Sequence, residues 1–393
     1  MSRLLWYPGH ELILDGIVRA EGCSLYDAAG NRYVDLESGV WCTSLGHAHP
    51  RIIEAIHEQY HRVAHTGFNF TSPVVDEVGD ELLALHGLDG GRCVFLCSGS
   101  ESVEYGVRVA WMLTEKPLLM TMADSYFGAY GSAWGRRADE WFCFDWFHCA
   151  SCPHEGECGE QCDHWCSIPF DRIGGFLFEP GSSSGLVRFP PEKLIRGIAR
   201  AVREAGGLIL VNEVTTGIGR TGKWFGYQHY DIAPDIVAMG KGIGNGYPVS
   251  ATVFSPRASQ SLGAREVAYA QSHQNDPLGA VVVREVLGTI KAKELIKRGA
   301  RIGERLLRGL HRIAGKSMRI IEVRGRGLMV GVSLDDDNGN SYATRIHREL
   351  IGRGFVVCLR PGVSVLRIDP ALTVEESDIE AFLEVFEDLV LSL

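Results

Sequence analysis

The sequence predicts an α/β fold built on a large, mostly parallel sheet. Residues 208–211 (LILV) and 236–239 (IVAM) are short apolar runs of the kind that form strands buried on both faces of such a sheet. Each run ends abruptly in polar or glycine residues, which is typical of a strand that enters a loop. Between residues 48 and 285, runs of this kind alternate with helical patterns, as in a parallel α/β sheet.

The chain divides into three parts: an N-terminal segment of residues 1–47, a large domain of residues 48–285, and a C-terminal part of residues 286–393. The expected strands are Leu25–Asp27, Arg32–Asp35, Cys93–Cys97, Pro117–Met122, Gly175–Phe178, 208–211 and 236–239, with further strand patterns in 319–332 and 355–368. The expected helices are Glu101–Leu113, a long stretch from Asp276 to Ile313, and an amphipathic helix over Val374–Leu391.

Composition narrows the class of protein. The chain has 393 residues, of which 45% are apolar and 22% charged, as in an ordinary globular enzyme. A net charge of -10 argues against a nucleic-acid partner. No apolar run approaches the ~20 residues of a membrane span, and the N-terminus lacks the apolar core of a signal peptide. We therefore expect a cytoplasmic protein without a membrane partner, in which the 11 cysteines are thiols or metal ligands.

Two polar residues follow the two apolar runs, Asn212 and Lys241. Ligands in open α/β sheets bind beyond the carboxyl ends of the strands, so both side chains are expected in one crevice. A lysine flanked by Gly240 and Gly242 can lose water and its proton, and can then form a Schiff base with an aldehyde cofactor. The alternative is a solvated surface lysine that follows a strand.

The run NEVTTGIGRTGKWFGYQHYDIAPDIVAMGKGIGNGYP closely resembles the class III pyridoxal-phosphate (PLP) aminotransferases. The resemblance extends from Tyr26 to Pro370. It implies a fold-type I enzyme with a large sheet domain and a small α+β domain made from the N- and C-terminal segments. It also implies a homodimer with a shared active site, an amino acid and a 2-oxo acid as small-molecule substrates, and Lys241 as the residue that binds the cofactor.

The resemblance assigns further residues to the cofactor. Ser98, Gly99 and Ser100 precede a helix and form a phosphate seat, because free N–H groups and the positive end of the helix attract anions; a simple N-cap at Ser100 is the alternative. Tyr126 stacks on the cofactor ring, unless it is only a core aromatic. The remaining cofactor residues implied by the resemblance are Glu179, at the end of a strand, and Ser272, which reaches the phosphate of the neighbouring subunit.

Substrate residues are implied by two other segments. Arg367 matches the arginine that binds the substrate carboxylate, for which its guanidinium fork is suited; a structural ion pair is the alternative. Val40 and Trp41 lie in the segment that lines the substrate pocket in relatives, although Trp41 could equally be core packing. Ser184 stands where relatives carry a glutamate that pairs with this arginine, so Arg367 is expected to remain available.

The sequence departs from the family at the two residues that contact the nitrogen and the hydroxyl group of the cofactor ring. Asn212 replaces the aspartate that keeps the pyridine nitrogen protonated, and Thr215 replaces the glutamine that contacts the ring hydroxyl. An amide supplies no charge, so the ring becomes a weaker electron sink. Aminotransferase activity remains the first hypothesis, and a lyase, decarboxylase or racemase on the same scaffold is the alternative.

A cysteine-rich insertion occupies residues 143–166 and also contains histidines. Thiolates at such short spacing suit zinc or an iron–sulfur cluster, and a metal would order a loop that buries little apolar surface. The expected ligands are Cys149, Cys152, Cys158, Cys162 and Cys166. Free thiols in a loop are the alternative, and a metal- or redox-sensing protein on a catalytically quiet scaffold is the corresponding rival function.

Overall fold

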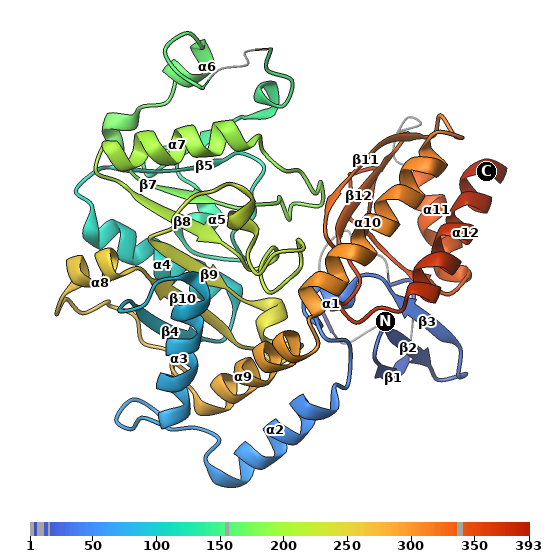
Figure 1. The fold of residues 1–393 in the computed structure, drawn as a ribbon, viewed down its shortest axis with the longest axis horizontal. Coiled ribbons are helices and arrows are strands. Elements are labelled where there is room, and N and C mark those ends of the chain that lie inside the picture. Colours follow the sequence, from blue (N-terminus) through green and yellow to red (C-terminus); the bar gives the residue numbers. More distant parts are fainter. Residues whose placement is uncertain (1–3, 6–11, 15, 154–156, 336–340) are drawn as a thin grey trace.

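The computed structural model describes residues 4–5, 12–14, 16–153, 157–335 and 341–393. Its centre is a seven-stranded sheet in the order β4-β10-β9-β8-β7-β5-β6 (Figure 1). In that order the strands are Arg92–Leu96, Ser250–Phe254, Ile236–Met239, Leu208–Asn212, Ile173–Phe178, Leu118–Met122 and Trp141–Phe144. Pairing is parallel from β9 to β6, and only β10 runs antiparallel to its neighbours, so the predicted mostly parallel α/β sheet is confirmed.

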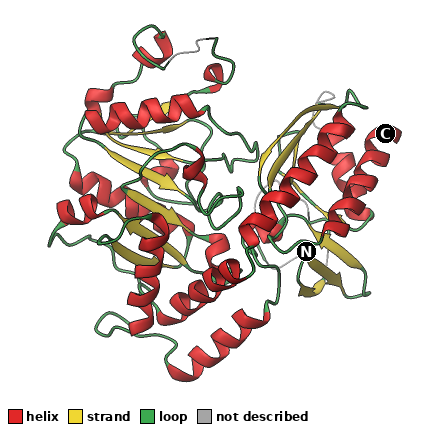
Figure 2. Ribbon diagram, in the orientation of Figure 1, coloured by secondary structure: helices red, strands yellow, loops and turns green. Residues whose placement is uncertain are grey.

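Helices cover both faces of this sheet (Figure 2). Alternate residues of a strand point to opposite faces, and in β8 Ile209 and Val211 join one apolar cluster while Leu210 joins the other. The first cluster packs under α3 (Pro73–His86), α7 (Glu192–Glu204) and α9 (Pro277–Ala292); the second packs under α4 (Gly99–Leu113) and α8 (Pro256–Leu262). Burial on both faces explains why these strands are almost wholly apolar.

A second lobe holds two four-stranded sheets (Figure 1). The first has the order β1-β2-β3-β13, with strands Ile17–Glu21, Ser24–Asp27, Arg32–Asp35 and Phe355–Val356. The second has the order β11-β12-β15-β14, with strands Ile320–Arg326, Met329–Leu334, Val365–Ile368 and Cys358–Leu359. Because β13 pairs with β3, the two ends of the chain share one sheet. The lobe also contains α10 (Leu295–Ala314), α11 (Ser341–Gly352) and α12 (Glu376–Ser392).

Other details differ from the expectations. The helix expected over Asp276–Ile313 is two helices, α9 and α10, because Glu294 adopts a left-handed conformation (φ 45°) that interrupts the helical hydrogen bonding. Strands β1, β6 and β10 were not anticipated. The remaining helices are α1 (Ser38–Trp41), α2 (Pro50–Arg62), α5 (Ser132–Gly135), α6 (Asp163–Cys166) and the 3₁₀ turns η1 (Phe147–Cys149), η2 (Phe170–Arg172), η3 (Gly226–His229) and η4 (Lys241–Gly244). None of the helices in the described ranges has the length and apolar character needed to cross a membrane.

Candidate active site

Polar residues follow the ends of neighbouring parallel strands at one edge of the large sheet. Asn212 ends β8, Tyr126 follows β5, and Glu179 follows β7. The Asn212 side-chain amide donates to the carbonyl oxygen of Tyr126 (3.1 Å), and the Tyr126 N–H donates to a Glu179 carboxylate oxygen (3.1 Å). Three of the expected site residues are therefore held together by hydrogen bonds.

Lys241 lies at the same edge, just after β9. Its ammonium nitrogen is 4.5 Å from the centre of the Trp41 ring. Burial, with a smaller contribution from nearby Arg367, lowers the pKa of Lys241 to about 8, while Cys42 and Glu179 oppose the shift. The side chain is therefore largely shielded from solvent, and about a tenth of its amine is neutral at pH 7.

The segment Ser98–Ser100 forms the start of α4. Ser98 caps this helix, since its hydroxyl accepts the N–H of Glu101 (3.3 Å). The cap is thus Ser98 and not Ser100, whose hydroxyl instead accepts the N–H of Ala129 in the loop after Tyr126 (3.0 Å). The first N–H groups of this 15-residue helix face the same edge of the sheet as the other site residues.

Gly99 permits a very close approach between strand ends. A Cβ atom at this position would lie 2.6 Å from a methyl carbon of Val214, so no side chain fits. A Cβ atom at Gly240 would in turn lie 3.1 Å from the Gly99 Cα. The glycines therefore bring the start of α4 against the loops after β8 and β9, and Val214 is a site residue that the sequence analysis missed.

The end of β8 carries an unsatisfied hydroxyl. Thr215 is only 4% exposed, and its Oγ1 has no hydrogen-bond partner among the described residues. A buried polar group without a partner is costly, so this hydroxyl is suited to a bound polar group. Asn212 is 2% exposed, and its carbonyl oxygen accepts the N–H of Val214 (3.1 Å). The amide is therefore fixed in orientation and carries no charge.

Arg367 lies in β15 of the second lobe and is 2% exposed. Its guanidinium carbon is 3.7 Å from the centre of the Trp41 ring, so Arg367 and Lys241 both lie against this indole. The Arg367 Nε is 3.3 Å from an oxygen of Asp369, but neither Nε nor Nη2 makes a hydrogen bond within the described chain. The structural ion pair thus exists, and the guanidinium retains donors for a further carboxylate.

Glu37 is a second residue that the sequence analysis missed. One of its carboxylate oxygens is 3.8 Å from Arg367 Nη2, and burial raises its pKa while the arginine opposes that shift. Ser184, which replaces the glutamate of relatives, is partly exposed, but its hydroxyl oxygen is buried and has no hydrogen-bond partner in the described ranges. Arg367 therefore does have a nearby glutamate, supplied by a different part of the chain.

Trp41 is carried by an unusual turn. Ser38, Gly39, Val40 and Trp41 all have positive φ angles (46°, 56°, 59° and 66°), a conformation that is unfavourable for residues with a Cβ atom. Trp41 is 3% exposed and packs with Val187 and Met329, so it is a core residue as well as a contact of both cations. Val40 is 45% exposed.

Ser272 stands apart from this group. It is exposed in a turn before α9.

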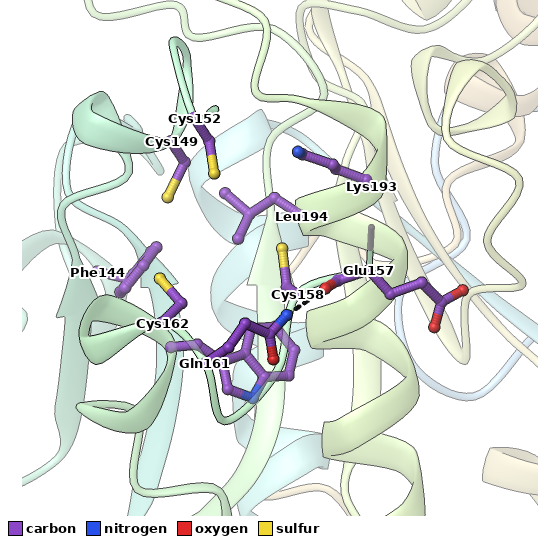
Figure 3. Close-up of a pocket in the computed structure, with 10 residues that line it drawn as sticks. Phe144, Cys149, Cys152, Glu157, Cys158, Gln161, Cys162, Lys193 and Leu194 are labelled. Carbon is purple, nitrogen blue, oxygen red and sulfur yellow. Dashed lines mark hydrogen bonds between the residues drawn. The ribbon is translucent and has the colours of Figure 1, made fainter. Parts of the chain in front are cut away.

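The cysteine-rich segment lies away from the strand-end site. Cys149, Cys152, Cys158 and Cys162 line one cavity beside α7, and their sulfurs face a common space (Figure 3). Burial, and then the other three thiols, raise the pKa of Cys149 to about 11. Cys166 is not part of this set: it is exposed, and its thiol donates to the carbonyl oxygen of Glu160 (3.4 Å). Four of the five expected ligands are thus brought together.

Comparison with known proteins identifies the family. The model for aminotransferase class-III matches residues 8–135 and 156–390. The chain is 31% identical to acetylornithine aminotransferase of Corynebacterium efficiens, over 92% of this chain and 89% of that protein. It is 27% identical to leucine/methionine racemase of Thermococcus litoralis, over 94% and 89%. A Bacillus anthracis aminotransferase structure has the same fold, with a TM-score of 0.87 at 21% identity over 100% of this chain and 97% of that one. This chain belongs to the class-III aminotransferase family and is a pyridoxal-phosphate-dependent enzyme.

Proposed function

We propose that this enzyme transfers the amino group of an amino acid to a 2-oxo acid. The observation that carries the proposal is the placement of Lys241 and Arg367 against the same ring, that of Trp41. An amine of lowered pKa and a buried guanidinium with unused donors suit a substrate that has an amino group and a carboxylate on one carbon.

Each strand end has a role toward the cofactor. The N–H groups at Ser98–Ser100 would hold its phosphate, and Thr215 Oγ1 would be available to its ring hydroxyl. Asn212 would offer an uncharged amide to the ring nitrogen, and Tyr126 would pack against the ring. Glu179 positions Tyr126 by accepting its N–H. When bound, pyridoxal phosphate delocalises the negative charge that develops at the substrate Cα.

The chain itself moves the proton. Lys241 Nζ takes the proton from the substrate Cα and returns it, which requires a neutral amine during the first step. Arg367 orients the substrate by binding its carboxylate, and Trp41 and Val40 close the pocket around the side chain. Glu37 neutralises Arg367 when no substrate carboxylate is present.

Several wider assignments complete the proposal. A homodimer is supported by the exposure of Ser272, which suits contact with the cofactor phosphate of a second copy. We propose the domain limits 1–47, 48–285 and 286–393, consistent with the sheet shared by β3 and β13. A cytoplasmic location agrees with the 11 unpaired thiols, and the net charge of -10 argues against a nucleic-acid partner.

We propose in addition that the cysteine-rich segment binds zinc or an iron–sulfur centre.

Racemisation is the second candidate, and Asn212 favours it. An uncharged amide leaves the ring less electron-withdrawing, so return of the proton to Cα competes better with its delivery to the cofactor. A relative that is 27% identical to this chain is a leucine/methionine racemase, which supports this second candidate.

A single-turnover experiment separates the two functions. The cofactor-loaded protein is mixed with L- and D-amino acids in deuterated water, without an acceptor. Formation of one 2-oxo acid per active site supports amino transfer. Deuterium incorporation at Cα with inversion, and no 2-oxo acid, would instead establish a racemase.

A further inference from the structure

The cysteine-rich segment leaves the large sheet at β6 and lies against α7. Glu157 forms a two-point ion pair with Arg200 of α7 (2.6 and 3.2 Å). Close to it, Gly197 gives room for the segment: a Cβ there would lie 3.1 Å from the Trp165 ring and 3.6 Å from the Cys158 Cβ. The small glycine therefore lets the cysteine-bearing loop lie directly on the helix.

The four thiols come from two short turns. Cys149 and Cys152 belong to the first turn, in which the Cys152 N–H donates to the carbonyl oxygen of Cys149 (3.4 Å). Cys158 and Cys162 belong to the second, in which the Cys162 N–H donates to Gly159 (3.1 Å). Each turn presents two sulfurs to the same cavity, an arrangement typical of paired metal ligands.

We propose that Cys149, Cys152, Cys158 and Cys162 form a four-thiolate site for a thiophilic metal centre, either zinc or an iron–sulfur cluster, and that Cys143 and Cys166 are not ligands. Such a site is separate from the proposed amino-transfer site and does not depend on it. Each thiol loses its proton to solvent as its sulfur binds the metal, and no oxidation of cysteine is involved. The centre would tie the two turns to each other on the surface of α7.

The surroundings fit this chemistry. Phe144, Trp165 and Leu194 line the cavity and keep it apolar, which strengthens metal–thiolate attraction. Lys193 of α7 lines it as well and offsets part of the negative charge that four thiolates bring (Figure 3). Cys149 and Cys152 also lie within residues 136–155, which the family match omits. Cys158 and Cys162 lie within the matched range, so only the first of the two turns falls outside the family match.

The spacing of the sulfurs bears on the kind of centre. Zinc holds its ligands at ~2.3 Å, so four sulfurs must converge on one point. In the part of the chain that the structure describes, the one group of three ligand atoms within 4.8 Å of one another is His65, His273 and Asp276, so no three of these thiols are that close. In a [4Fe–4S] cluster each thiolate binds a different iron, which allows wider spacing. A zinc site would require side-chain rotations that draw the sulfurs together.

The test measures metal on the whole protein, purified anaerobically without added metal. Zinc, iron and acid-labile sulfide are determined per chain for the wild type, Cys152→Ser, Cys162→Ser and the matched control Cys166→Ser. We expect about one centre per chain in the wild type and in Cys166→Ser, and loss of most of it in the other two variants. Zinc without sulfide identifies a zinc site, whereas iron with equimolar sulfide identifies a cluster.

Other results would overturn the proposal. A wild-type protein with only trace metal, or a control that loses as much metal as Cys162→Ser, contradicts the four-thiolate set. Should the serine variants fail to fold, labelling of the wild type by a maleimide gives an independent answer. Cys143 and Cys166 should react at once, and the four cavity thiols only after a chelator is added. Equal labelling with and without the chelator would refute the site.

Discussion

Replacing Arg367 by glutamine should remove the preference of the enzyme for substrates with a carboxylate. The guanidinium is 2% exposed, and its Nε and Nη2 form no hydrogen bond with the described residues. Glutamine keeps part of the side-chain volume against Trp41, but it supplies neither the positive charge nor the two parallel N–H donors of the guanidinium. The matched variant Arg367→Lys keeps the charge beside Asp369 while losing the two-point geometry.

The magnitude follows from burial. Losing one partner of a buried, hydrogen-bonded charge pair costs about 2–5 kcal/mol. At 1.4 kcal/mol per factor of ten, kcat/KM for an amino acid should fall by roughly 30-fold to several thousand-fold in Arg367→Gln. A primary amine with the same side chain and no carboxylate should lose far less, because it never forms this pair. Arg367→Lys should fall between the wild type and Arg367→Gln.

The assay compares kcat/KM for the two donors in each variant, with the melting temperature as a control for folding. Asp369 is completely buried, so the glutamine variant leaves a carboxylate without its cation and should be less stable than the lysine variant. An equal loss of activity toward both donors would show that Arg367 supports the fold and does not recognise the carboxylate.

Four further predictions concern the same site. Lys241→Ala should abolish turnover and the absorption of the covalently bound cofactor; normal activity would disprove the role of this lysine. Because burial lowers the pKa of Lys241 to about 8, its neutral fraction increases as the pH rises through that value. Capture of added cofactor by the cofactor-free protein should accelerate about tenfold between pH 7 and 9, and a flat profile would contradict the shift. Asn212→Asp should increase the ratio of 2-oxo acid formed to Cα proton exchanged, since a carboxylate raises the pKa of the ring nitrogen; an unchanged ratio would mean that Asn212 does not steer the reaction. Glu37→Gln should favour donors with a carboxylate and disfavour those without one, and the opposite change in kcat/KM would refute its pairing with Arg367.

The strands of the large sheet could be predicted where burial on both faces dictates an apolar run. β8 and β9 are of this kind, and their positions match the prediction. β10 (SATVF) begins with serine and contains threonine, so it lacks the same apolar signal although every residue in it is buried. The break between α9 and α10 could not be predicted either, because the left-handed residue is Glu294 and no glycine or proline marks it.

The location of site residues at strand ends could be predicted, because the carboxyl ends of parallel strands lie at one edge of the sheet. Contacts between segments that are distant in the sequence could not be predicted. Glu37 approaches Arg367 only because β3, which precedes it, and β15 come together across more than three hundred residues, as the hydrogen bond from Ser38 to Asp369 illustrates (331 residues apart). Likewise, which four cysteines line the cavity depends on how the loop lies on α7, and the spacing of the cysteines in the sequence does not determine this.

The turn at Ser38–Trp41 connects these observations. A left-handed conformation costs roughly 1–2 kcal/mol for each residue with a Cβ atom, so it must be imposed by its surroundings. The carboxylate of Asp35 accepts the N–H groups of Glu37 (2.9 Å) and Gly39 (3.2 Å). The hydroxyl of Ser38 donates to the backbone carbonyl oxygen of Asp369 (2.6 Å). These bonds tie the turn to β3 and to the end of β15. The same backbone therefore sets Glu37 beside Arg367 and holds Trp41 against both the guanidinium of one lobe and the lysine of the other, so the strain at this turn serves to join the two halves of the site.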